Sequence, residues 1–138
     1  MEKGFSVGLD VMCCNPHGPV YCTPKWVADA GCNVVAVTDD AYFGLFYEDT
    51  LTESLFGKLA NRHPRVLAIK LDGATKEEYV WGFRTGFITF GATGSEPQPK
   101  LLEALEKKTM GIIRAKISNC PHPSQTFVIE ALQSPDFL

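Results

Sequence analysis

The sequence has no large excess of charge of one sign and no long hydrophobic run. Its 13 Lys and Arg residues stand against 16 Asp and Glu residues, which leaves a net charge of −3 at pH 7. A nucleic-acid-binding surface normally shows as a basic excess, so this composition argues against nucleic-acid binding. No stretch approaches the roughly 18 consecutive apolar residues that indicate a transmembrane helix. We therefore expect neither a nucleic-acid partner nor a membrane partner.

Cysteine occurs in an odd number and at uneven spacing. The 138 residues contain five cysteines: Cys13, Cys14, Cys22, Cys32 and Cys120. An odd number at irregular spacing argues against the disulfide framework of a small secreted domain. The first residues, Met1 to Phe5, also lack the basic-then-apolar layout of a signal peptide. Reduced thiols in the cytoplasm are the simpler expectation.

One Cys/His cluster suggests an alternative, a metal site. Cys14 and His17 form a Cys-x2-His pair, and Cys13, Cys22 and Cys32 lie nearby. Structural zinc needs four ligands in tetrahedral arrangement, usually supplied as two close pairs. Only one close pair is present. We therefore predict small buried thiols and no metal, and keep a small Cys/His metal module as an alternative.

Composition and pattern indicate one α/β domain. Hydrophobic residues make up 45% and charged residues 21%, as in ordinary globular proteins. Apolar β-branched runs such as residues 34–37 suit strands buried on both faces of a parallel sheet. Capping signals begin two helices, a Thr-Pro at residues 23–24 and a capping box at residues 50–53. Strands that alternate with helices predict a three-layer, mainly parallel sheet flanked by helices.

The predicted elements are the following. Strands are expected over residues 6–13, 33–38, 66–71 and 85–90, and helices over residues 24–30, 50–60, 99–114 and 123–133. Asp72-Gly73 reads as a turn after the third strand.

Polar residues follow three of the predicted strands. Asn15 follows the first strand, Asp39 and Asp40 follow the second, and residues 72–76 follow the third. Ligands of open α/β sheets bind beyond the carboxyl ends of the strands. The pattern therefore predicts a site that offers amide, carboxylate and amine groups, without specifying a reaction.

Four short motifs occur in order along the chain. The first two are Asn-Pro-x-Gly at residues 15–18 and Asp-x-x-Tyr at residues 39–42. The third is Lys76 with a glycine and an arginine six and eight residues later, and the fourth is Arg-x-x-x-Ser-Asn at residues 114–119. In these motifs and their order, the chain resembles the class I/II, fold type I, pyridoxal-phosphate-dependent aminotransferases.

The resemblance implies a role for each motif residue. Lys76 would form a Schiff base with pyridoxal 5'-phosphate and afterwards move a proton between substrate and cofactor. Asp39 would pair with the pyridine nitrogen, which keeps the ring an electron sink. Tyr42 and Asn15 would hydrogen-bond the phenolic oxygen of the ring. The fork of Arg84 would bind the cofactor phosphate.

The resemblance also implies a substrate and a domain. Arg114 would lie near the substrate, and the reaction would move an amino group between an amino acid and a 2-oxo acid. Residues 1–138 would be the central part of one cofactor-binding large domain, with an N-terminal flank and a C-terminal small domain lying outside them. A domain cut in this way leaves apolar faces and strand edges uncovered, so we expect a homodimer or other self-association.

Two other interpretations stand beside this one. Lys70 also ends a predicted strand, but it lacks an arginine eight residues later, so we favour Lys76 as the Schiff-base lysine. The chain could instead be a non-catalytic, truncated remnant that keeps the α/β core and acts only in association.

Overall fold

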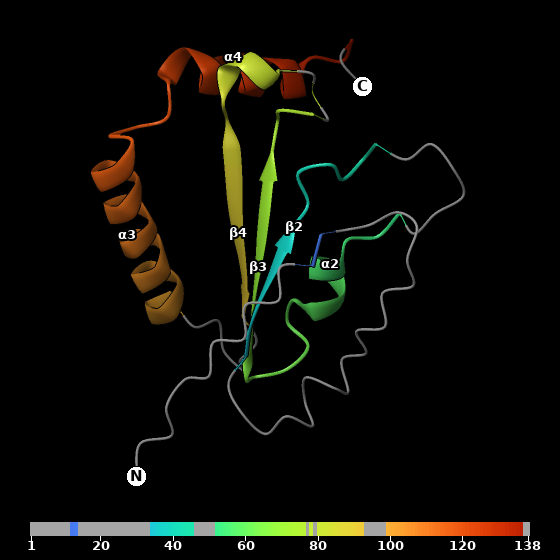
Figure 1. Cartoon of the computed structure of the whole chain (residues 1–138), viewed down its shortest axis with the longest axis vertical. Coiled ribbons are helices and arrows are strands. Elements are labelled where there is room, and N and C mark those ends of the chain that lie inside the picture. The colour runs from blue at the N-terminus through green and yellow to red at the C-terminus, as the bar shows by residue number, and fades with distance from the viewer. Residues whose placement is uncertain are drawn as a thin grey trace.

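A computed structural model describes residues 12–13, 34–45, 52–76, 78, 80–92 and 99–136 (Figure 1). The elements are, in order, β1 (Met12–Cys13), β2 (Val34–Asp39), α2 (Leu55–Leu59), β3 (Val66–Gly73), the 3-10 helix η1 (Trp81–Phe83), β4 (Gly86–Ala92), α3 (Pro99–Lys116) and α4 (His122–Gln133). The predicted helix over residues 24–30 and most of the predicted first strand lie outside the described residues.

The four strands form one mixed sheet in the order β1-β2-β3-β4. The β1–β2 and β2–β3 pairs are parallel, whereas β4 runs antiparallel to β3. A parallel pair needs a crossover connection, usually an α-helix. The described part of the connection between β3 and β4 holds only η1, a short 3-10 helix. The α/β class is therefore confirmed, with a mixed sheet in which one strand is reversed.

Two packing regions surround the sheet. Helix α2 packs against β2 and β3, and Leu59, Val66 and Ala68 are buried in this part of the chain. Helix α4 lies across the end of the sheet where β3 ends and β4 begins (Figure 1). There Val128 forms a buried cluster with Ala74 and Val80. Because Ala74 and Val80 stand on either side of Lys76 in the sequence, this cluster anchors the segment that carries Lys76 to α4.

Helix α2 begins later than predicted. The capping box at residues 50–53 is wrong as a helix start, because the N-cap is Ser54, whose Oγ accepts a hydrogen bond from the Phe56 N–H at 3.1 Å. The same hydroxyl donates to a buried carboxylate, a tertiary contact that local sequence does not reveal. Asn61, with φ of 58°, takes the left-handed conformation that commonly follows a helix end.

The other helices and strands largely match their predictions. Helices α3 and α4 and strands β2 and β4 lie within two residues of the predicted bounds. Strand β3 instead continues through Asp72-Gly73, which was predicted as a turn. Gly73 pairs with Gly86 on β4, and a Cβ at Gly73 would lie 3.1 Å from the Thr85 carbonyl oxygen. The absence of a side chain at Gly73 thus allows β3 and β4 to pair closely. The turn follows at residues 74–76.

A second glycine, Gly91 on β4, lets the strand approach α2. A Cβ at this position would lie 2.8 Å from the Ala60 Cβ and 3.3 Å from the Phe56 ring. We expect Gly91→Ala to lower the free energy of unfolding by about 1–3 kcal/mol, because an overpacked contact forces the backbone to move. Urea denaturation would measure the loss. Gly82→Ala is the control, since a Cβ there meets no heavy atom of the described chain within 4 Å; equal midpoints for the two variants would contradict this account.

Candidate functional site

Four predicted site residues lie near one edge of the sheet. Strands β2 and β3 are parallel neighbours, so both end at this edge, which we call the carboxyl edge. Strand β4 is antiparallel and begins there, because Gly86 pairs with Gly73. Asp39 ends β2, and Tyr42, Lys76 and Arg84 lie in the segments next to the strand ends. The topology therefore gathers groups that lie far apart in the sequence.

Lys76 and Tyr42 are in contact. Lys76 lies in the turn after β3, and its Nζ is 4.9 Å from the centroid of the Tyr42 ring. This distance is within the range of a cation–π interaction. Tyr42, in the turn after β2, is 62% exposed, and Lys76 is half-buried. An amine and a phenol ring thus lie together at an accessible position of the carboxyl edge.

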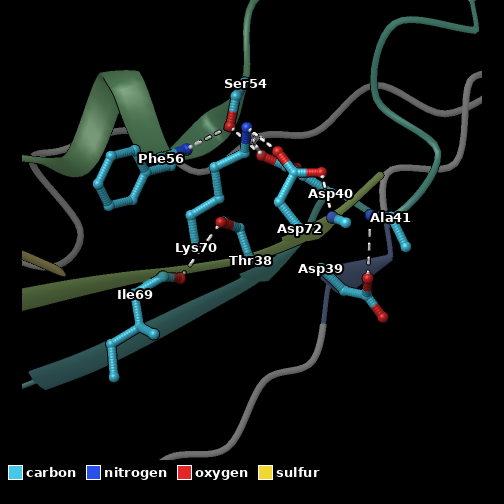
Figure 2. A network of polar contacts seen from close by, with 10 residues as sticks. Thr38, Asp39, Asp40, Ala41, Ser54, Phe56, Ile69, Lys70 and Asp72 are labelled. Carbon is cyan, nitrogen blue, oxygen red and sulfur yellow. Dashed lines mark hydrogen bonds and ion pairs between the residues drawn. The ribbon is translucent and has the colours of Figure 1, made fainter. Parts of the chain in front are cut away.

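Asp39 shapes the turn that carries Tyr42. Its Oδ1 accepts a hydrogen bond from the Ala41 N–H at 3.2 Å, a local turn contact typical of Asp. The backbone N–H of Phe43 then donates to the Asp40 carbonyl at 2.8 Å and closes the turn. Figure 2 shows the Asp39 side chain pointing away from that of Asp40, as expected for consecutive residues at the end of a strand.

Arg84 is held in an unusual backbone conformation. Its φ is 54°, in the left-handed region that is costly for residues with a Cβ. Its side chain is exposed, and its carbonyl oxygen accepts a weak hydrogen bond from the Cys120 Sγ at 3.8 Å. The residue lies between η1 and β4, so its backbone is connected both to the carboxyl edge and to the segment before α4.

Arg114 makes its described side-chain contact away from this arrangement. Arg114 lies near the end of α3, beside the sheet in Figure 1, and its guanidinium donates to the Ser118 Oγ at 2.7 Å. Both residues belong to the predicted Arg-x-x-x-Ser-Asn motif, so the contact stays within that motif. Asn15 lies outside the described residues.

A buried charged cluster that the sequence interpretation missed lies beneath the carboxyl edge. The Asp40 side chain is 0% exposed, and its Oδ2 accepts a hydrogen bond from the Ser54 Oγ at 2.5 Å. The Lys70 Nζ lies 3.8 Å from this same Oδ2 and 2.5 Å from the Asp72 Oδ2. We call Asp40, Ser54, Lys70 and Asp72 the Asp40 cluster; Figure 2 shows their side chains converging.

The sequence did contain a signal for this cluster. Successive strand side chains point to opposite faces, so two consecutive Asp residues at a strand end place their carboxylates on different sides. By the same period of two, Lys70 and Asp72 share a face. What pattern alone could not supply was the parallel β2–β3 register, which pairs Thr38 with Lys70 and so places Asp40 next to Asp72.

The structure also bears on the competing lysine. The Lys70 side chain is 20% exposed, and its amine is ion-paired and lies 5.1 Å from the centroid of the Phe43 ring. An amine held in this way is less available as a nucleophile than that of Lys76. Lys70 therefore has a structural environment different from the one an attacking lysine needs.

No group of three or more metal-ligating side chains occurs within the described ranges, and Cys14 and His17 lie outside them. Among the helices that the structure describes, none is both long and apolar enough to cross a membrane. In comparison with known proteins, no protein-family model matches the chain, and no curated protein sequence matches it significantly.

Proposed function

We propose that the chain is a pyridoxal-phosphate-dependent, aminotransferase-like polypeptide that moves an amino group between an amino acid and a 2-oxo acid. The observation that carries the proposal is the contact of the Lys76 amine with the Tyr42 ring at 4.9 Å, on the edge of the sheet where β2 ends in Asp39. Open α/β sheets bind their ligands at this kind of edge. The choice of pyridoxal 5'-phosphate as the cofactor comes from the family resemblance of the four sequence motifs.

The chemistry of the gathered groups fits pyridoxal 5'-phosphate. A carboxylate, a phenol, an amine and a guanidinium match its ring nitrogen, ring oxygen, aldehyde and phosphate, respectively. Asp39, Tyr42, Lys76 and Arg84 would hold the cofactor through these four groups. When bound, the pyridoxal ring supplies an electron sink for bond cleavage at the substrate α-carbon.

The protein's own residues would each do a defined task. Lys76 would bond to the aldehyde carbon of the cofactor, and its amine, once displaced by the substrate amine, would move a proton between the substrate and cofactor carbons. The negative charge of Asp39 would keep a proton on the ring nitrogen. Tyr42 orients the ring through its hydroxyl, and the planar fork of Arg84 accommodates two phosphate oxygens. Arg114 remains our proposed contact for the substrate.

The first experiment asks which lysine the cofactor selects. The full chain, mixed with one equivalent of pyridoxal 5'-phosphate and reduced with borohydride, should carry the label on Lys76. A modified lysine resists trypsin, so label on Lys76 appears in the peptide of residues 71–84, whereas label on Lys70 appears in residues 66–76. Lys76→Arg should remove the label, and the exposed-lysine variant Lys58→Met should retain it. Label spread over many lysines, or unchanged in Lys76→Arg, would contradict the proposal.

One observation favours a second candidate, a non-catalytic protein that acts by association with a second copy. Large apolar side chains are exposed on α3, at the residue that follows it, and on α4: Leu102, Met110, Ile112, Ile113, Ile117, Phe127, Ile129 and Leu132. Clustered apolar exposure marks interaction surfaces. A dimer in sedimentation that takes no label at Lys76 would select this candidate over the enzyme.

A further inference from the structure

We propose that Lys70 is a positioning residue whose ammonium sets the spacing between the turn that carries Tyr42 and the strand that leads to Lys76. The inference rests on the proposed function, because the groups that Lys70 would keep in place are those that would hold the cofactor. Lys70 would act on these groups through the carboxylates of the Asp40 cluster, with which its ammonium pairs.

Lys70 contacts both ends of the turn that carries Tyr42. Its Nζ lies 3.8 Å from the Asp40 Oδ2 and 5.1 Å from the centroid of the Phe43 ring. Asp40 and Phe43 also close this turn through their backbones, with the Phe43 N–H donating to the Asp40 carbonyl at 2.8 Å. Tyr42 lies between these two contacts. A shift of the ammonium would therefore be transmitted to the turn from both of its ends.

The same ammonium is tied to the strand that leads to Lys76. Its Nζ lies 2.5 Å from the Asp72 Oδ2, and the other oxygen of that carboxylate accepts a hydrogen bond from the Gly73 N–H at 2.7 Å. The turn with Lys76 starts directly after Gly73. Between the strands, the Asp40 N–H donates to the Leu71 carbonyl at 2.8 Å. The Lys70 side chain thus spans the junction between the two turns.

Burial makes these contacts specific. The side chains of Asp40, Lys70 and Asp72 are 0%, 20% and 19% exposed. Charges this deep are kept only when they are paired, and an apolar replacement of similar volume often stabilises a fold equally well. Overall stability therefore does not require an ion cluster here. What the cluster provides, and an apolar side chain does not, is one fixed distance between two carboxylates on neighbouring strands.

The test compares Lys70→Met, which keeps the length of the side chain, with Lys70→Arg, which keeps the charge. In the full chain, Lys70→Met should slow borohydride-trapped labelling of Lys76 roughly tenfold to a hundredfold, since a misplacement of about 1 Å can cost this much. Lys70→Arg should recover most of the rate. Lys58→Met is the matched control, because Lys58 forms an exposed ion pair with Glu53 at 3.1 Å. A wild-type rate in Lys70→Met, or an equal defect in Lys70→Arg, would overturn the proposal.

A second readout separates this inference from the proposed function. In NMR spectra of the full chain without cofactor, cross-relaxation between the Lys76 ε-methylene and the Tyr42 ring should be strong in the wild type, lost in Lys70→Met and restored in Lys70→Arg. Loss of this signal in a chain that takes no label supports positioning while the cofactor assignment fails. Labelling of Lys76 together with an unchanged signal in Lys70→Met refutes positioning alone. Should Lys70→Met fail to fold, Asp72→Asn removes the charge of the carboxylate 2.5 Å from the Lys70 Nζ and is expected to lose the same signal. A signal kept in that variant would refute the proposal.

Discussion

Asp40→Ala is expected to lower the free energy of unfolding by about 3–5 kcal/mol, the usual cost of removing one partner from a buried ion pair. The Asp40 side chain is 0% exposed and is the acceptor for the Ser54 hydroxyl as well as a partner of Lys70. Its removal leaves a polar hydroxyl and a mostly buried ammonium without this carboxylate, and it opens a cavity between β2 and α2. Urea denaturation followed by circular dichroism would measure the loss.

Asp39→Ala is the matched control for this variant, because the two residues are identical and adjacent. Asp39 is half-buried and makes a single local hydrogen bond, so its loss should cost only about 1 kcal/mol. Asp40→Asn should fall between the two, since an amide oxygen still accepts from Ser54 but carries no charge. If Asp40→Ala and Asp39→Ala unfold at the same urea concentration, removing Asp40 leaves no buried partner uncompensated, and this prediction is wrong.

Val128→Asp is expected to detach α4 from the rest of the chain. Val128 is 3% exposed and packs with Ala74 and Val80, which stand on either side of Lys76. A carboxylate placed among these apolar side chains would lack a partner, a class of substitution that costs about 4 kcal/mol or more. We expect a large fall in thermal stability. Labelling of Lys76 should fall with it, because α4 supports the segment that carries this lysine.

The neighbouring residue on α4 offers the control. Ile129 is 52% exposed, so Ile129→Asp exchanges one exposed side chain for another and should change stability by less than about 0.5 kcal/mol. The Phe127 and Phe83 rings, whose centroids are 4.9 Å apart, should lose their contact only in Val128→Asp. Similar melting temperatures for the two variants would show that α4 does not support the Lys76 segment.

The fold was predictable where the local pattern is clear. The β-branched run of β2, which pairs with β3, and the long helix α3, which buries no residue, lie within two residues of their predicted bounds. The errors lie where a distant partner overrides a local signal. Asp72-Gly73 has the composition of a turn, yet pairing of Gly73 with Gly86 extends the strand. Likewise, α2 was predicted to begin at the capping box of residues 50–53, but its N-cap is Ser54, whose hydroxyl also donates to the buried Asp40 carboxylate.

The candidate site divides in the same way. Parallel strands end at a common edge, so proximity of the segments that hold Asp39, Tyr42 and Lys76 followed from the order of elements alone. The Asp40 cluster depends on the β2–β3 register, which pairs residues 32 positions apart and has no local signature. Lys70 was considered only as a rival nucleophile, because its partner Asp40 becomes visible only once the strands are paired and Asp72 was predicted to lie in a turn.

The opposite orientation of Asp39 and Asp40 limits how the gene encoding this chain can change in length. Strand side chains alternate, so removing one codon from β2 would move every following side chain to the other face. The carboxylate now at the open site would then be sequestered next to Lys70, and the sequestered one would face the solvent. Insertions and deletions in β2 should therefore be tolerated only in steps of two residues, whereas the loops beyond the sheet are free of this constraint.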